Sequence, residues 1–207
     1  MTFSRSPRLV KGAFIQFDGQ NSPANMIVFQ YNPDKIYRRL EARVKKPRNI
    51  ASKDLPREVI TFTITLDAAD SLEHADEHPE TAETGIYPSL SAIEMLLYPG
   101  NSVQTQKSFL GIKWPLSGNK RPLTLFVWGN ERLLPVLVTD LNINEEMFDP
   151  ALNPLRADIE ITMLVLNDTD LPRAYRGYEY CKSYLANKIN LAKKVYTSVP
   201  MSDLKKS

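Results

Sequence analysis

Apolar and polar residues alternate with a period of two in the two most regular segments of this chain. In Arg57–Asp67 every second residue from Ile60 to Leu66 is apolar, and residues 155–166 repeat the pattern at odd positions. Such alternation predicts long β-strands with one apolar and one polar face. The polar faces carry Thr61, Thr63 and Thr65 in the first segment, and Arg156, Asp158, Glu160 and Thr162 in the second.

Shorter segments predict further strands over 9–17, 26–31, 35–44, 123–128 and 133–144. Residues 18–23 favour a hairpin loop, and the charged segment 35–44 is typical of an edge strand. Within 133–144 the alternating apolar residues change from even to odd positions, which indicates a β-bulge near Thr139 and Asp140. The acidic segment 67–83 is interpreted as a loop.

Two helices are predicted. One covers 89–98, with Ser89 as N-cap and with Leu90, Ile93, Leu96 and Leu97 at helical spacing. The second covers about 172–195. We therefore expect a mainly β domain over 1–168 and a C-terminal helical extension with a tail over 169–207.

Composition narrows the functional class. The chain has 207 residues, a formal net charge of +2 and one cysteine, Cys181, so it forms no intramolecular disulfide and no cysteine-rich metal site. It contains no run of about 18 apolar residues, as a membrane span requires. We expect a chain made in the cytoplasm without a signal peptide and not inserted into a membrane.

The charges are segregated along the sequence. Residues 38–57 are basic and residues 67–83 are acidic, and both are interpreted as solvated loops or protein contacts. In a ring, the basic segment of one copy would meet the acidic segment of the next in a heterologous contact. The candidate residues for that contact are Arg43, Lys45, Lys46 and Arg48 on one side, and Asp70, Glu73, Asp76 and Glu77 on the other.

No segment carries a strong catalytic signal. His74 and His78 are spaced for a zinc site only if the segment is helical, and no third ligand is identifiable. Cys181 has no neighbouring motif of a nucleophile, and no phosphate-binding glycine loop is present. We therefore predict a protein without catalytic residues, metal or cofactor. The polar strand faces have two interpretations, which are ordinary solvent exposure and the wall of an aqueous channel.

Five segments in order resemble one family. They are 28–34 (VFQYNPD), 62–67 (FTITLD), 85–100 (GIYPSLSAIEMLLYPG), 122–129 (PLTLFVWG) and 133–155, with the core EEMFDPALNP at 145–154. Together, over about 9–168, they resemble the tube-like domain of baseplate adaptors in extracellular contractile injection systems. Those systems are phage-tail-like particles of the antifeeding-prophage and Photorhabdus virulence-cassette type.

This resemblance implies a phage-tail-tube-like β-sandwich or barrel of two packed antiparallel sheets. The helix over 89–98 would pack outside it and bury Leu90, Ile93 and Leu97. Six copies would form a ring around a lumen, joining the spike hub to the inner tube and initiating tube assembly. The particle would be released extracellularly. Nucleic acid is not expected as a partner. The polar-face residues Thr61, Thr63, Thr65, Arg156, Asp158, Glu160 and Thr162 become candidates for the lumen wall.

The sequence departs from that family after residue 168, where members often continue into a LysM domain. Here the remaining residues read as a helix and tail. The helix either contacts a partner such as a baseplate wedge or sheath protein, or packs on its own domain. Its candidate contact residues are Tyr175, Tyr178, Tyr184, Leu185 and Ile189.

Other functions stay open from the sequence. The protein is alternatively a tail-tube or baseplate protein of a contractile phage, which the neighbouring genes would distinguish. A second alternative is a β-barrel module that binds nucleic acid or polysaccharide through the basic segment. A hydrolase using His74 and His78 would require a stoichiometric metal.

Overall fold

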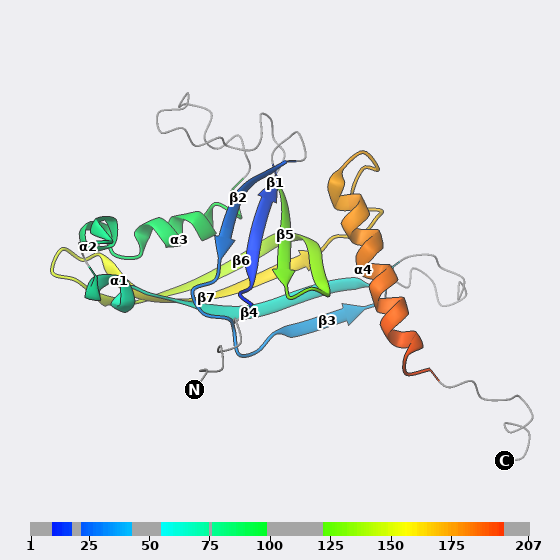
Figure 1. The fold of residues 1–207 in the computed structure, drawn as a ribbon, viewed down its shortest axis with the longest axis horizontal. Helices are drawn as coiled ribbons and strands as arrows, with labels where there is room; N and C mark the ends of the chain where they lie inside the picture. Colours follow the sequence, from blue (N-terminus) through cyan, green and yellow to red (C-terminus); the bar gives the residue numbers. More distant parts are fainter. Residues whose placement is uncertain (1–9, 18–21, 43–54, 75, 99–121, 197–207) are drawn as a thin grey trace, which may run out of the picture.

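The computed structural model describes residues 10–17, 22–42, 55–74, 76–98 and 122–196 (Figure 1). This part of the chain is mainly β. Its strands are β1 (Ala13–Phe17), β2 (Pro23–Val28), β3 (Tyr37–Glu41), β4 (Arg57–Asp67), β5 (Leu123–Trp128), β6 (Arg132–Phe148) and β7 (Pro154–Val165). Its helices are α1 (Ala69–Glu73), α2 (Pro79–Thr84), α3 (Tyr87–Glu94) and α4 (Arg176–Lys193).

All seven strands belong to one antiparallel sheet with the order β2-β1-β5-β6-β7-β4-β3. The sheet is not closed, and β2 and β3 are its two edges. The predicted hairpin of the first two strands, the edge position of β3 and the long strand Arg57–Asp67 are confirmed. The register of β6 against β7 shifts between Val138 and Asp140, so the predicted bulge is confirmed as well.

The sheet bends so that its β2-β1-β5 part crosses over its β6-β7-β4 part (Figure 1). Phenylalanine rings meet between the two parts, although their strands are not neighbours. The ring of Phe62 on β4 lies 5.3 Å from that of Phe126 on β5 and 6.4 Å from that of Phe14 on β1. These rings and the aliphatic residues of β4, β6 and β7 form the main core. Burial of the apolar face of β4 and β7 thus leaves their threonines and carboxylates outside.

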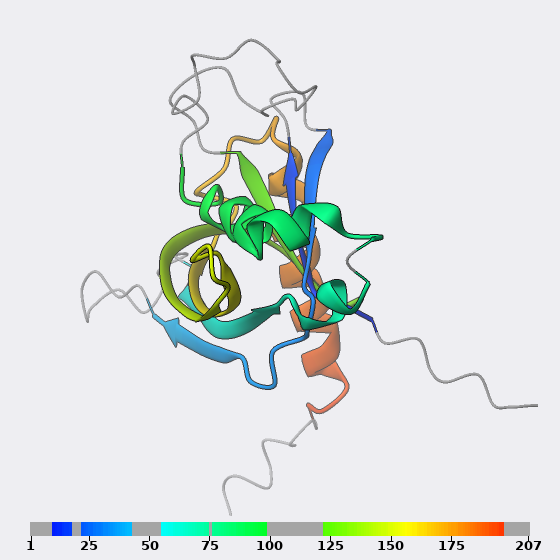
Figure 2. The same ribbon diagram turned by 90° about the vertical axis from the view of Figure 1, so that its left-hand side faces the viewer.

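Helix α3 lies beside β2, and the views from two directions agree on this position (Figure 2). Leu90 and Ile93 are buried in the core and Leu97 packs against it, as predicted. The predicted N-cap at Ser89 is wrong, because α3 begins at Tyr87 with Pro88 in its first turn. Proline suits that position, since its missing N–H would have no partner in the helix.

The interpretation of 67–83 as a loop is also wrong in part. This segment contains helix α1 and all of helix α2 except its last residue, Thr84. Both are short and bury none of their residues, so no apolar periodicity marks them in the sequence. Gly85 ends α2 with φ +60°, and a Cβ at this position would collide with the carbonyl oxygen of Pro154. A glycine is therefore required where the helices approach the beginning of β7.

Helix α4 packs on the ends of β1, β5 and β6 by the side that carries Gly177 and Cys181. It begins at Arg176, so Pro172 precedes it rather than opening it. Tyr180 contacts a small second core formed by Phe17, Leu123 and Leu125. None of the helices in the described ranges is both long and apolar enough to cross a membrane.

Candidate functional site

The outer face of β4, β7 and β6 is a continuous polar surface. Antiparallel pairing places one residue of each strand side by side, so the surface consists of four rows. From one end to the other, the rows are Thr61–Thr162–Asp140, Thr63–Glu160–Asn142, Thr65–Asp158–Asn144 and Asp67–Arg156–Glu146. All seven residues predicted for a lumen wall therefore lie on one face.

Hydrogen bonds within each row fix these side chains. The hydroxyl oxygens of Thr61 and Thr162 are 3.1 Å apart, and Thr65 Oγ1 donates to Asp158 Oδ1 at 2.6 Å. Asn142 Nδ2 donates to Glu160 Oε2 at 3.1 Å, and the guanidinium of Arg156 lies 3.1 Å from Asp67 Oδ2. The surface is thus preorganised by its own strands.

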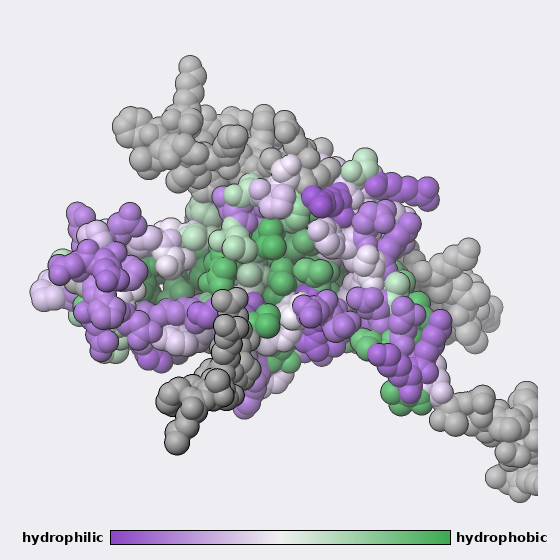
Figure 3. Space-filling model, viewed as in Figure 1, coloured by the Kyte–Doolittle hydropathy of each residue, from purple (hydrophilic) through white to green (hydrophobic). Residues whose placement is uncertain are grey.

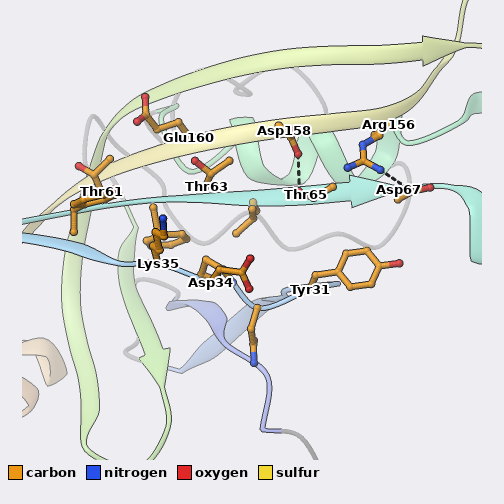
Figure 4. A pocket seen from close by; sticks show the side chains of 15 residues that line it. Tyr31, Asp34, Lys35, Thr61, Thr63, Thr65, Asp67, Arg156, Asp158 and Glu160 are labelled. Carbon is orange, nitrogen blue, oxygen red and sulfur yellow. Dashed lines mark hydrogen bonds and ion pairs between the residues drawn. The ribbon is translucent and has the colours of Figure 1, made fainter.

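The connection between β2 and β3 stands opposite this face and encloses a groove of about 700 Å³ with it (Figure 4). Asp34 and Lys35 of the connection line the groove together with the β4 and β7 side chains. Two residues hold the connection in place. Gln30 donates to the carbonyl oxygen of Asp67 and accepts from its N–H, and Asn32 bonds the backbone of Val10 and Gly12.

The groove is acidic. Asp34, Asp67, Asp158 and Glu160 line it, against the two cations of Lys35 and Arg156. Asp140 and Glu146 of β6 extend the same face with two further carboxylates. A surface with this charge repels phosphates, and it favours water, cations and polar groups.

A second polar cluster lies at the other end of β4. The carboxylate of Glu58, which is 5% exposed, accepts hydrogen bonds from Arg38 of β3 and from Lys188 and Tyr184 of α4. Lys188 Nζ is 2.6 Å from Glu58 Oε2. Burial alone would raise the pKa of Glu58, but the bonds from Lys188 and Arg38 outweigh it and lower that pKa. Burial raises the pKa of Tyr184, which therefore stays a donor. This cluster anchors α4 to the β3 edge.

The predicted partner-contact residues of the C-terminal helix divide between two environments. Tyr184 belongs to the Glu58 cluster and so packs on its own domain, while Leu185 and Ile189 are exposed. Tyr175 and Tyr178 are half-buried at the helix start, where Lys182 lies over the Tyr178 ring.

Of the residues predicted for a charge contact between copies, the structure describes only the acidic ones. Asp70, Glu73, Asp76 and Glu77 are exposed on or between α1 and α2. Arg43, Lys45, Lys46 and Arg48 lie outside the described residues.

The residues considered for catalysis are not brought together. His74 ends α1 and His78 precedes α2, so the two imidazoles do not share one helical face. No group of three or more histidine, cysteine or acidic side chains within the described ranges could hold a metal ion. The Cys181 thiol donates to the carbonyl oxygen of Leu166, and burial raises its pKa to about 12, so it is a poor nucleophile at neutral pH.

Sequence reasoning missed the contribution of β6 to the polar face. After the bulge, Leu141 and Ile143 pack against the core, and the alternate residues Asp140, Asn142 and Asn144 face outward. The change of the apolar residues from even to odd positions could have predicted this. Sequence reasoning also missed Glu58, because a charged residue at the beginning of an amphipathic strand reads as solvent-exposed. Its partners come from β3 and α4, far away in the sequence.

No family model matches the chain, and no curated protein matches it either. Its function is therefore argued from the site, where the observations are an open sheet, an ordered acidic polar face and a helix fixed to one edge.

Proposed function

We propose that this protein is a structural component whose copies form a ring, with the polar face of β4, β7 and β6 lining a water-filled lumen. The observation that carries the proposal is the combination of two open sheet edges with one ordered polar face. The role that fits best is that of a baseplate adaptor and tube initiator in a contractile injection system. It would be a hexamer without enzymatic activity, with a tail-tube-like β-barrel completed between copies.

The edge strand β2 supports pairing between copies. Phe29 N donates to Gly12 O at 2.9 Å, and bonds alternate along an antiparallel pair, so the backbone groups of Met26 and Val28 point away from β1. Both side chains are exposed, and β2 carries no charge that would protect it. Such an edge invites another strand.

The apolar surroundings of β2 add to this support. Figure 3 shows apolar side chains gathered over the β2-β1-β5 part of the sheet, between two polar ends of the molecule. Met26, Val28 and Leu133 are exposed large apolar residues of these strands and of the adjoining β6. An exposed apolar patch with polar surroundings is typical of a protein interface. Here β2 would be the edge that joins one copy to the next.

The charge of the polar face bears on the partners. Its carboxylates make nucleic acid an unfavourable ligand, so we propose protein partners, namely the spike hub on one side and the inner tube on the other. A baseplate wedge or sheath protein is a further candidate for contact with α4. The protein would then leave the cell as part of a released particle.

The test is the assembly state of the purified protein. Native mass spectrometry and negative-stain electron microscopy, alone and with the neighbouring hub and tube proteins, are expected to show annular hexamers. A chain that stays monomeric at all concentrations, even with those proteins present, would contradict the proposal.

A further inference from the structure

The tip of the β6–β7 hairpin lies at one extreme of the molecule (Figure 1). Met147 is 66% and Leu152 is 74% exposed, and Phe148 between them is also exposed. Exposed apolar residues scattered singly require no explanation, but these three lie at the end of one hairpin, and we call them the tip knob. Glu145, Glu146 and Asp149 are neighbours of the tip knob in the chain, and Glu145 and Glu146 are exposed.

The tip knob is held in a strained and well-ordered conformation. Met147 and Leu152 have φ of 57° and 67°, in the left-handed region that costs a non-glycine residue about 1–2 kcal/mol. Asn153 fixes the turn, because its N–H and Nδ2 donate to the two Asp149 oxygens at 2.8 Å and Nδ2 also donates to the carbonyl oxygen of Glu83. Strain retained by such bonds, beside exposed apolar groups, indicates a contact surface.

The opposite end of the molecule carries the matching chemistry. On α4, Leu185 and Ile189 are four residues apart, so they share a side of the helix, and both are exposed. Lys182 lies three residues before Leu185, and Lys193 lies four after Ile189 on the same side. This α4 stripe is apolar with positive surroundings, and the Glu58 cluster fixes its orientation.

We propose that the tip knob of one copy docks on the α4 stripe of the next copy. The two surfaces are both apolar, opposite in flanking charge and at opposite ends of one molecule, so the contact is head-to-tail. Two copies of the same surface would bring like charges together, which disfavours a symmetric pairing. The inference rests on the ring of the proposed function, to which it adds an inter-copy contact separate from the edge strands.

Crosslinking tests the contact directly. In a Cys181→Ser background, one population carries Leu152→Cys and a differently tagged population carries Ile189→Cys, and a short bismaleimide is added to the mixture. We expect a covalent heterodimer that contains both tags. Each population alone is the matched control, and it should give little product.

Charge reversal supplies the second measurement. Glu145→Lys in the first population, or Lys193→Glu in the second, should lower the heterodimer yield about tenfold. Mixing the two reversed populations should restore it. Circular dichroism melts of each variant separate lost contact from lost folding.

The outcomes separate this inference from the proposed function. Rings that form normally, without the heterodimer crosslinked between positions 152 and 189, would overturn the inference and leave the proposed function standing. The heterodimer in open chains without rings would support the inference and count against the ring. Capture of an unrelated protein by both surfaces, with no self-contact, would also overturn the inference.

Discussion

The two edge strands of the sheet differ in their protection against pairing with other chains. β3 carries Arg38 and Arg39 and is tied to α4 through Glu58, whereas β2 is uncharged and exposes Met26 and Val28. Charge on an edge strand discourages pairing with unwanted chains, and an uncharged apolar edge does not. The difference indicates that β2 is the edge that requires a partner.

The two edges also depend on different interactions for stability. The part of the sheet that includes β2 is held over the core by phenylalanine rings, while β3 is held at its beginning by an ionic cluster. Apolar contacts respond less to ionic strength and acid than ion pairs do. The comparison can therefore be tested by substitutions that affect one part and not the other.

Phe62→Ala is expected to have the largest effect. Phe62 is buried and contacts the rings of Phe14, Phe29 and Phe126, so its loss leaves a cavity where the two parts of the sheet cross. We expect a loss of about 3–5 kcal/mol in the free energy of unfolding, independent of salt. Urea unfolding at low and high ionic strength measures both. A loss below about 1 kcal/mol would mean that the crossing is not held by these rings.

Glu58→Gln should have the next largest effect. The amide cannot neutralise Arg38 and Lys188, but both cations can turn toward water, so we expect about 2 kcal/mol rather than the full cost of an unpaired buried charge. Glu41→Gln on the same edge is the matched control, because its ion pair with Arg39 is exposed and contributes about 0–1 kcal/mol. Equal effects of the two substitutions in urea unfolding would show that Glu58 is not an anchor.

The sequence predicts most of the fold where periodicity is strong. Arg57–Asp67 is a strand with the predicted bounds, and the bulge after Val138 follows from the parity of the apolar residues alone. α1 and α2 escaped prediction because neither buries a residue, and therefore neither has an apolar period. The order of strands in one bent sheet depends on contacts such as Phe14 with Phe62, which local patterns do not encode.

The candidate site also has a part that the sequence predicts and a part that depends on distant contacts. The shared face of Thr61, Thr63 and Thr65 follows from alternation, and so does that of the β7 residues. The groove requires Gln30 and Asn32 to fold the β2–β3 connection over that face, through bonds to distant backbone groups. Its role as a lumen wall stays a prediction.

Acid should weaken the β3 anchor before the aromatic core. Because the folded pKa of Glu58 lies below its ordinary value of 4.5, its stabilising contribution is present above about pH 4.5 and is lost as the pH falls through the folded pKa. The loss should approach that of Glu58→Gln, since the protonated acid, like the amide, is neutral and still accepts a hydrogen bond from Tyr184. Stability curves of the wild type and Glu58→Gln should converge in this acid range. Parallel curves would exclude Glu58 as the titrating group.

Of these substitutions, Met26→Lys should change the free energy of unfolding least and the assembly of copies most. Met26 is 65% exposed, so the substitution is expected to alter the free energy of unfolding by less than about 0.5 kcal/mol. A lysine on the outer side of β2 gives this edge the protection that β3 already has, and strand addition from a second copy should then fail. Native mass spectrometry should show monomers.

Leu133→Lys is the control that isolates the edge. Leu133 is an exposed apolar residue of β6 that pairs with Val127 of β5, so it receives the same added charge away from the β2 edge. If both variants assemble like the wild type, β2 is not the joining edge. If both fail, added charge on the apolar face is sufficient to block assembly, and the difference between the two edges is not what directs it. Failure of Met26→Lys alone would locate the joining surface in the backbone of β2 and would explain why only β3 carries protective charge.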